Sequence, residues 1–181
     1  MSNKSKRVFP NSTVNAFHED GDVKIVESTL EHAAYLQHHL RSSDVRECLI
    51  HGATPWRALH APLASKKAVT WTGMYKDTPA CMFGVVPYQM TDDYVAGTVW
   101  LLGTEVLETE FRKFLRVSRN MSDWLLEHYD FLENVVPIDH EQTIKWLDWM
   151  GFAFGEEPVV INGYLCTRFV RCIDTIEVRF E

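Results

Sequence analysis

The amino-acid sequence predicts an α+β domain whose core is a mixed, mostly antiparallel sheet of six to seven strands, flanked by about four to five helices. Runs of alternating or continuous apolar residues, which are typical of strands, occur before and after a long amphipathic segment at 108–130. Most of these runs are joined by short turns, which favour antiparallel hairpins. Only the segments around the two late helices are long enough for parallel crossovers, so we expect a mixed sheet.

Length and composition are those of one globular domain. The chain has 181 residues, of which 46% are apolar, so it can bury a core without disulfides or metals. A net charge of −7 argues against wrapping nucleic acid, which requires a broad basic surface. Residues 1–21 are polar and are expected to form a flexible N-terminal arm, leaving 22–181 as a single domain. We identify no secretory signal and no apolar run long enough to span a membrane.

The cysteines and histidines show no metal-ligand spacing. The four cysteines are isolated and resemble small apolar residues, although a pairing of Cys166 with Cys172 stays open. His32, His38 and His39 fall in one predicted helix, but none belongs to a His-Glu-x-x-His motif. We therefore expect no metal site.

The N-terminal half is predicted to hold one strand and three helices. Residues 22–27 (DVKIVE) alternate as a half-buried strand does. Ser28 and Glu31 have the spacing of a capping box, which predicts that a helix begins there. Two short helices are expected next, at about 44–51 and 54–65, and a threonine followed by proline opens the second.

Strands dominate the middle and the end of the chain. Residues 68–75 and 79–88 predict a hairpin around the turn-like trio 76–78, and a third buried strand is expected at 97–103. After the late helices, an Asn-Gly pair separates two more β-rich runs, which is a strong hairpin signal. The closing residues 175–181 could add an edge strand or form a tail.

Two amphipathic helices enclose one short apolar strand, LENVVPID. The first helix has apolar residues at steps of three and four from Phe111 onward, and Arg112, Arg116 and Arg119 lie on another face. The second helix reads HEQTIKWLDWM and is expected to end at Gly151.

This order of elements resembles that of the GNAT acyltransferases. The ending IDHEQTIKWLDWMGF is similar to their last motif, in which Asn opens a helix and Gly-Phe closes it. In this sequence Asp139 can cap the helix, and Gly151 supplies the left-handed turn that ends it. The resemblance implies a GNAT-like fold, with acetyl-CoA as the cofactor if the chain is an enzyme.

A second resemblance covers most of the chain. The segments HGATPWRALHAPLASKKAVTWTGMYKDTPACMFGV and VWLLGTEVLETEFRKFLR, with the helix that ends LLEHYDFLENVV, resemble the small internal virion protein A of short-tailed, podovirus-type bacteriophages. This resemblance implies a phage-encoded protein of the virion or host cytoplasm that acts in virion assembly or genome ejection. Its partners would be other phage virion proteins or host proteins.

The loop before the long helix is where the GNAT resemblance places a cofactor. GNATs bind the CoA diphosphate there with Arg/Gln-x-x-Gly-x-Gly/Ala, whose glycines let backbone amides approach the phosphates. This chain reads LLGTEVLETEFRK, so the cofactor-binding candidates are Leu102, Gly103, Arg112 and Lys113. The loop has one glycine and several glutamates, which would repel a diphosphate and are themselves favourable at a helix N-terminus.

Acetyl transfer to an amine also requires a general base and an acid. The tyrosine that GNATs commonly use as the acid corresponds to Leu147, which cannot donate a proton. His140 and Glu105 are the candidate bases, and each is also explained as a solvent-facing residue near a helix end. Two functions therefore stay open. The first is a GNAT-fold virion protein without intact acyltransferase chemistry, and the alternative is an acetyl-CoA-dependent N-acyltransferase that modifies a host or viral amine.

Overall fold

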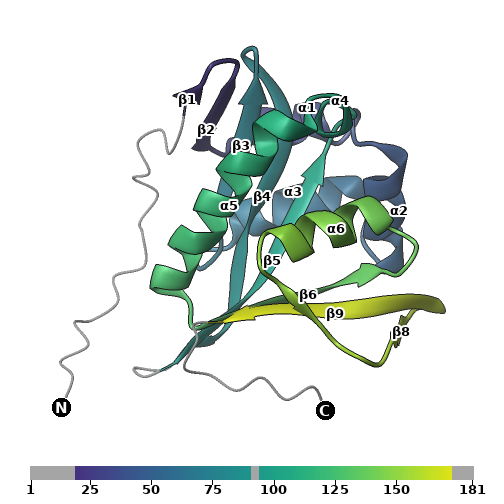
Figure 1. The fold of residues 1–181 in the computed structure, drawn as a ribbon. Coiled ribbons are helices and arrows are strands. Elements are labelled where there is room, and N and C mark those ends of the chain that lie inside the picture. The colour runs from purple at the N-terminus through teal and green to yellow at the C-terminus, as the bar shows by residue number, and fades with distance from the viewer. Residues whose placement is uncertain (1–18, 91–93, 173–181) are drawn as a thin grey trace, which may run out of the picture.

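One sheet forms the centre of the protein (Figure 1). The computed structural model describes residues 19–90 and 94–172. Within these ranges the strand order is β1-β2-β3-β4-β5-β6-β9-β7, and β8 pairs with β9. Every pair is antiparallel except β5 with β6. The predicted α+β class with a mixed, mostly antiparallel sheet is confirmed.

The elements follow the predicted order. The strands are β1 (Glu19–Asp20), β2 (Val23–Glu27), β3 (Val69–Tyr75), β4 (Thr78–Met90), β5 (Val95–Gly103), β6 (Phe131–Pro137), β7 (Ala153–Phe154), β8 (Val159–Ile161) and β9 (Tyr164–Cys172). The helices are α1 (Leu30–Leu36), α2 (Ser42–Ile50), α3 (Pro55–Ala64), α4 (Val106–Thr109), α5 (Phe111–His128) and α6 (Glu141–Trp149). In the described ranges, seven strands are longer than two residues and five helices are longer than one turn.

Helices cover both faces of the sheet. In Figure 1, α5 and α6 lie in front of the sheet, α1 and α3 lie behind it, and α2 stands at one side. The larger apolar core lies under α5 and α6 and includes the fully buried Tyr129 and Leu132. A smaller core lies under the rear helices and includes Leu59 and Met82. The candidate site described below belongs to the front layer.

Left-handed backbone marks the predicted turns. The hairpin before β4 turns at Lys76 and Asp77, with φ angles of 47° and 61°. The Asn-Gly hairpin turns at Asn162 and Gly163, with φ angles of 46° and 85°. Gly151, with a φ of 88°, follows α6 as expected for a helix-ending glycine. These three turn predictions are confirmed.

The cap of α1 differs from the sequence prediction by one residue. Thr29, and not Ser28, is the N-cap, and its hydroxyl accepts a hydrogen bond from the amide of His32 at 3.2 Å. The amide of Thr29 donates in return to Nδ1 of His32 at 3.3 Å, so His32 takes the place expected for Glu31. Ser28 is used elsewhere because its hydroxyl lies 2.9 Å from that of Thr72 in β3.

The predicted N-terminal arm contains the start of the sheet. Glu19–Asp20 form β1, in which Asp20 pairs with Val23. Residues 1–18 of the arm, and residues 173–181 with the expected edge strand or tail, lie outside the described residues.

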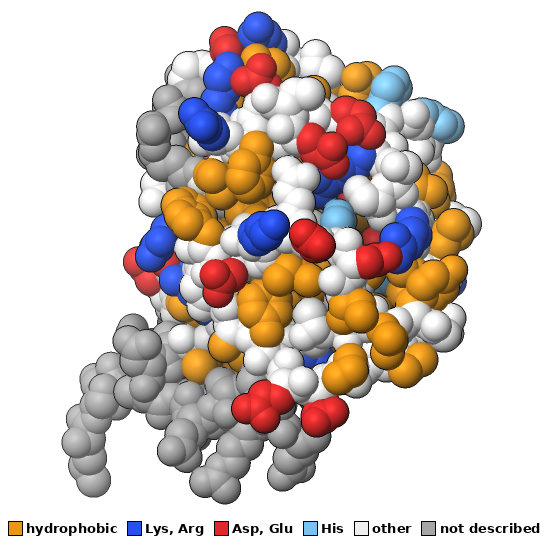
Figure 2. Space-filling model, turned by 45° about the vertical axis from the view of Figure 1, so that its right-hand side comes forward, with side chains coloured by type: hydrophobic (Ala, Val, Ile, Leu, Met, Phe, Trp, Pro, Cys, Tyr) orange, Lys and Arg blue, Asp and Glu red, His pale blue; other side chains and the backbone are white. Residues whose placement is uncertain are grey.

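Apolar side chains are exposed on the side of the molecule that carries α2 and β8. They gather on the face shown in Figure 2. The exposed residues from these segments are Leu49, Ile138, Val160, Tyr164 and Leu165. Val160 pairs with Leu165 across the hairpin, and the amide of Ile138 donates to the carbonyl of Leu165 at 3.2 Å. We call this surface the β8–β9 patch.

Candidate active site

The two parallel strands separate after three residue pairs. β5 pairs with β6 only from Ala96–Phe131 to Thr98–Glu133. At the next residue of β6, hydrogen bonds of the Asn134 side chain replace the backbone hydrogen bonds between the two strands. Its Nδ2 donates to the carbonyl of Val99 at 2.7 Å, and its Oδ1 accepts from the amide of Val135 at 2.7 Å. The C-terminal ends of β5 and β6 therefore diverge, and a gap opens between them.

Only some of the backbone N–H and C=O groups on the edge of β5 along this gap have hydrogen-bond partners. At its end, the amide of Gly103 donates to Asp44 Oδ2 at 2.6 Å, and its carbonyl accepts from the amide of Arg41 at 3.0 Å. Strand alternation places the N–H and C=O of Leu101 on this same edge, between Val99 and Gly103. In the described part of the chain, no hydrogen bond reaches these two Leu101 groups on that side. One donor and one acceptor thus face the gap.

A cavity of about 140 Å³ occupies the gap and continues beneath α5. Its wall is mostly apolar and includes Phe114, Met121 and Leu125 from α5. Charged residues are confined to one end, where Arg41 and Glu47 line it. The cavity therefore has an apolar interior and one ionisable end, which is the usual composition of a ligand pocket.

Trp146 of α6 lies at the mouth of this cavity. Its side chain is 7% exposed, and it lines both the cavity and a narrow crevice between α5 and α6. The ring packs edge-on against Phe111, with ring centroids 6.1 Å apart. Among the described residues, its Nε1–H has no hydrogen-bond partner. A buried donor without a partner costs about 1–3 kcal/mol, so a ligand acceptor at this position would be favourable.

Four ionisable side chains converge at the charged end of the cavity. Arg41 and Asp44 are buried, and Nε of Arg41 lies 2.9 Å from Oδ1 of Asp44. Glu47, one turn further along α2, lies 3.8 Å from Nδ1 of His140. Because α2 and the start of α6 come from different halves of the chain, the fold brings His140 to a carboxylate that sequence spacing did not link to it.

The environment shifts the pKa values of this cluster. Burial, assisted by the charge of Asp44, raises the pKa of Glu47 from 4.5 to about 7. Burial also raises the pKa of Asp44, opposed by the neighbouring Arg41, and lowers the pKa of His140. Glu47 therefore exchanges a proton near neutral pH, which suits a general base or acid.

Glu47 is the ionisable residue that sequence reasoning missed. Arg41, Asp44 and Glu47 follow one another at intervals of three residues, which places neighbouring members on one helical face. Such spacing is equally typical of a solvated helix face. Only the packing of α2 against the ends of β5 and β6 distinguishes the two cases.

The loop between β5 and α5 holds a helical turn where the GNAT resemblance places a phosphate cradle. The amides of residues 107–110 all donate to carbonyls within the loop and α4. The amide of Val106 donates to the hydroxyl of Thr104 at 3.3 Å. A phosphate-binding loop needs these amides free. The next amides, those of Phe111 and Arg112, begin α5 and have no hydrogen-bond partner within the described part of the chain.

The predicted cofactor-binding residues form two pairs, one at the end of β5 and one at the start of α5. Leu102 is buried in the rear core, and the backbone of Gly103 is engaged by α2. A Cβ at Gly103 would lie 2.3 Å from Cδ1 of Leu107, so close packing requires this glycine. Arg112 is exposed in the first turn of α5.

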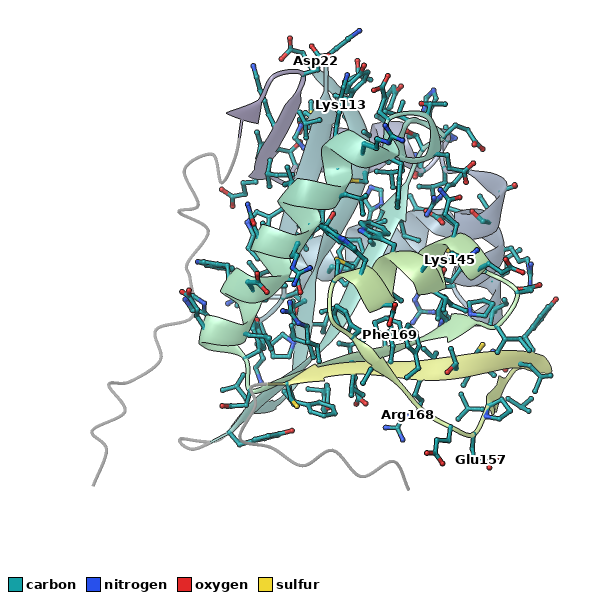
Figure 3. The ribbon with its side chains drawn as sticks, viewed as in Figure 1. Asp22, Lys113, Lys145, Glu157, Arg168 and Phe169 are labelled. Atoms are coloured by element: carbon teal, nitrogen blue, oxygen red, sulfur yellow. The ribbon has the colours of Figure 1, made fainter. Side chains whose placement is uncertain are left out.

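Lys113 is held by neighbouring side chains at the top of α5, beside Asp22 (Figure 3). Its Nζ lies 3.2 Å from Asp22 Oδ2, 3.0 Å from Glu110 Oε2 and 3.2 Å from the hydroxyl of Tyr75. The two carboxylates neutralise the charge of Lys113. Its attraction for a phosphate is therefore weaker than its position in the sequence indicates.

The predicted catalytic residues are also separated. Glu105 is the exposed residue before α4 and does not line the cavity. His140 precedes α6 as its N-cap but makes no side-chain cap bond. The prediction that Asp139 caps this helix is wrong, because Asp139 accepts hydrogen bonds from Arg46 of α2 at 2.6 and 2.9 Å. Leu147 is buried in the cavity wall and offers no proton.

The described residues offer neither a metal centre nor a membrane-spanning helix. Within residues 19–90 and 94–172, no group of three His, Cys, Asp or Glu side chains could hold a metal ion. No helix in those ranges is both long and apolar enough to cross a membrane.

Comparison with known proteins supports the fold assignment. No family model matches the chain, and no curated protein matches it. Among solved structures, an acetyltransferase of the GNAT family from Streptococcus pneumoniae gives a TM-score of 0.55 at 13% identity, covering 83% of this chain and 99% of that one. RimL, a ribosomal L7/L12 alpha-N-protein acetyltransferase in complex with coenzyme A, gives 0.61 at 9% identity, covering 89% and 99%. AAC(6')-Ib in complex with ribostamycin and coenzyme A gives 0.63 at 13% identity, covering 84% and 94%.

The protein therefore has the GNAT fold, as its order of elements predicted. At these identities the likeness defines the fold alone.

Proposed function

We propose that this protein is an acyl-CoA-dependent N-acyltransferase. The observation that carries the proposal is the cavity between the diverging ends of β5 and β6, with Glu47 at one end. Two proteins of the same fold, RimL and AAC(6')-Ib, were solved with coenzyme A. A GNAT fold, an open slot and a base with a pKa near neutrality together favour acyl transfer.

The groups that line the slot suit the amide-containing arm of coenzyme A. Leu101 offers one backbone donor and one acceptor along the gap. Trp146 offers a buried indole N–H at the mouth. An extended chain with amide groups can satisfy all three, as a strand added to a sheet edge does.

The diphosphate of coenzyme A cannot be bound by a glycine-rich loop in this protein, because the loop amides before α5 already donate hydrogen bonds. The amides of Phe111 and Arg112 begin α5, where the helix dipole favours negative charge. We assign the main side-chain contact to the exposed guanidinium of Arg112. Lys113 has a secondary role because Asp22 and Glu110 already hold it.

Glu47 is the proposed general base. A bound thioester supplies the acyl group, and the acceptor is a primary amine. As the new C–N bond forms and the C–S bond breaks, Glu47 takes the amine proton, with His140 3.8 Å away to share it. A free thiol has a pKa of about 8.5, so the departing sulfur needs little help from an acid. The leucine at position 147 is thus compatible with the reaction.

Binding is tested by thermal unfolding with acetyl-CoA. A ligand at about 100 times its dissociation constant stabilises a fold by about 2.7 kcal/mol. For a chain of this size that corresponds to a rise in Tm of about 5–10 °C. Arg112→Ala should reduce the rise, and Arg57→Ala, an exposed arginine of α3, should not. No rise with millimolar acetyl-CoA or with longer acyl-CoAs would exclude the acyltransferase.

Catalysis is tested by release of coenzyme A thiol in the presence of primary amines, including peptide N-termini. Glu47→Gln should bind acetyl-CoA normally and lose transfer by about 10²–10⁴-fold, the usual contribution of a general base. Glu157→Gln, an exposed acid in the loop after β7, is the matched control. Equal transfer by Glu47→Gln and the control would remove Glu47 from the mechanism.

A second candidate function is the virion role implied by the resemblance to internal virion protein A. It is favoured by the β8–β9 patch, since exposed apolar clusters often mark interaction surfaces. The engaged amides of α4 and the leucine at 147 also agree with it. Under this alternative the partners are phage virion or host proteins, in the virion or the host cytoplasm. Acetyl-CoA would then leave the Tm unchanged.

A further inference from the structure

The cavity extends well beyond the strand edge that the coenzyme arm would follow. Its lining includes Ile25 of β2 and Cys81 and Phe83 of β4, in addition to the residues beside the gap. In the sheet order, β2 lies three strands away from β5. At the usual spacing between neighbouring strands this is about 14 Å. The space therefore runs across the sheet beneath α5, away from the gap between β5 and β6.

This deeper part is mostly apolar. Ile25, Cys81 and Phe83 form one side, and Val117 and Met121 of α5 form the other. Two serines of α5 also line the cavity, but the hydroxyl of Ser118 donates to the carbonyl of Phe114 and that of Ser122 accepts from Arg171. The charged lining residues, Arg41, Asp44 and Glu47, come from the segment around α2 at the opposite end. Such a lining suits hydrocarbon and disfavours water, because a water molecule requires polar partners. The polar arm of coenzyme A, by contrast, requires hydrogen bonds at the strand edge.

The volume sets the size of the group that fits. A dry apolar cavity of about 150 Å³ accommodates one benzene ring, which has six carbons. The cavity here measures about 140 Å³ in all, including the part beside the gap, so this volume is an upper limit for the acyl group. An acetyl group offers one methyl carbon to this space and would leave most of it empty.

We infer that the acyl group carried into this site is a medium-length apolar chain of up to about six carbons, and not acetyl. The inference rests on the proposed acyl-CoA function and specifies its substrate class. The acyl chain lies beneath α5, between Met121 and the strand residues of β2 and β4. The thioester stays near the gap, close to the end that Glu47 occupies.

The test is a calorimetric titration of the full chain with acetyl-, hexanoyl- and dodecanoyl-CoA. Each additional buried methylene should tighten binding about fourfold. Hexanoyl-CoA should therefore bind on the order of 100-fold more tightly than acetyl-CoA. Dodecanoyl-CoA exceeds the cavity and should bind no better than hexanoyl-CoA. Equal or weaker binding of hexanoyl-CoA would overturn the inference and leave acetyl transfer standing. Binding of none of the three would refute the proposed function itself.

A matched pair of substitutions tests where the acyl chain binds. Met121→Phe enlarges a side chain that lines the cavity, and Met82→Phe makes the same change in the rear core. The preference for hexanoyl-CoA over acetyl-CoA should fall at least tenfold in Met121→Phe and persist in Met82→Phe. An unchanged preference in a folded Met121→Phe would place the acyl chain elsewhere and overturn the assignment. If either variant does not fold, the chain-length series on the unmodified protein still decides the inference.

Discussion

The pKa of Glu47 makes a prediction about stability that needs no substrate. Burial favours the neutral carboxylic acid, which raises the pKa from 4.5 to about 7 in the folded protein. Between these two values the folded state holds a proton that the unfolded state has released. The free energy of unfolding therefore decreases as the pH rises through this window, because the unfolded state binds fewer protons.

The size of the effect follows from the shift. A difference of one pKa unit corresponds to 1.36 kcal/mol, so the shift of Glu47 is worth about 3 kcal/mol. This contribution is fully present below pH 4.5 and is lost by about pH 7. Glu47→Gln replaces the acid with a neutral side chain of the same shape. At pH 5 the variant should already be more stable than the unmodified protein by a little under about 1 kcal/mol, and at pH 8 by about 3 kcal/mol.

The measurement is urea unfolding followed by tryptophan fluorescence from pH 4.5 to 8, with Glu157→Gln as the control. Glu157 is exposed, and its variant measures the effect of the same acid-to-amide change outside the cavity. Taking the difference between two proteins removes the contributions of ionisable groups that do not interact with Glu47. A Glu47→Gln variant that is no more stable than the unmodified protein at pH 8 would refute the reasoning.

Three further predictions concern the frame of the site. Asp44→Asn leaves buried Arg41 with only the partly exposed Glu108, 3.6 Å away, as its counter-charge and should lower the free energy of unfolding by about 1.5–3 kcal/mol, measured by urea unfolding. Asn134→Asp places a carboxylate where the amide donates at the strand divergence, and should cost about 2 kcal/mol at pH 7 in the same assay, with a smaller loss under acidic conditions that protonate it. Gly151→Ala should cost about 1–2 kcal/mol in thermal unfolding because its φ of 88° is left-handed, and no loss there would contradict the assigned turn after α6.

Local sequence signals determined most of the architecture. Apolar periodicity predicted the strands and the long helix, because the alternation of side chains depends on the backbone period alone. The Asn-Gly pair and Gly151 predicted turns, because few residues adopt positive φ without strain. Sequence alone placed the cap of α1 one residue early, since Ser28 and Thr29 can both cap a helix and only the contact with Thr72 separates them.

The candidate site was decided by the tertiary structure. Glu47 and His140 meet because α2 packs across the ends of β5 and β6, and the same packing shifts the pKa of Glu47 by removing it from water. The cavity depends on strands that separate at Asn134, a residue with no unusual local pattern. The short α4 engages amides that a linear motif would leave open to phosphate. Such effects depend on contacts between distant segments, which no local period encodes.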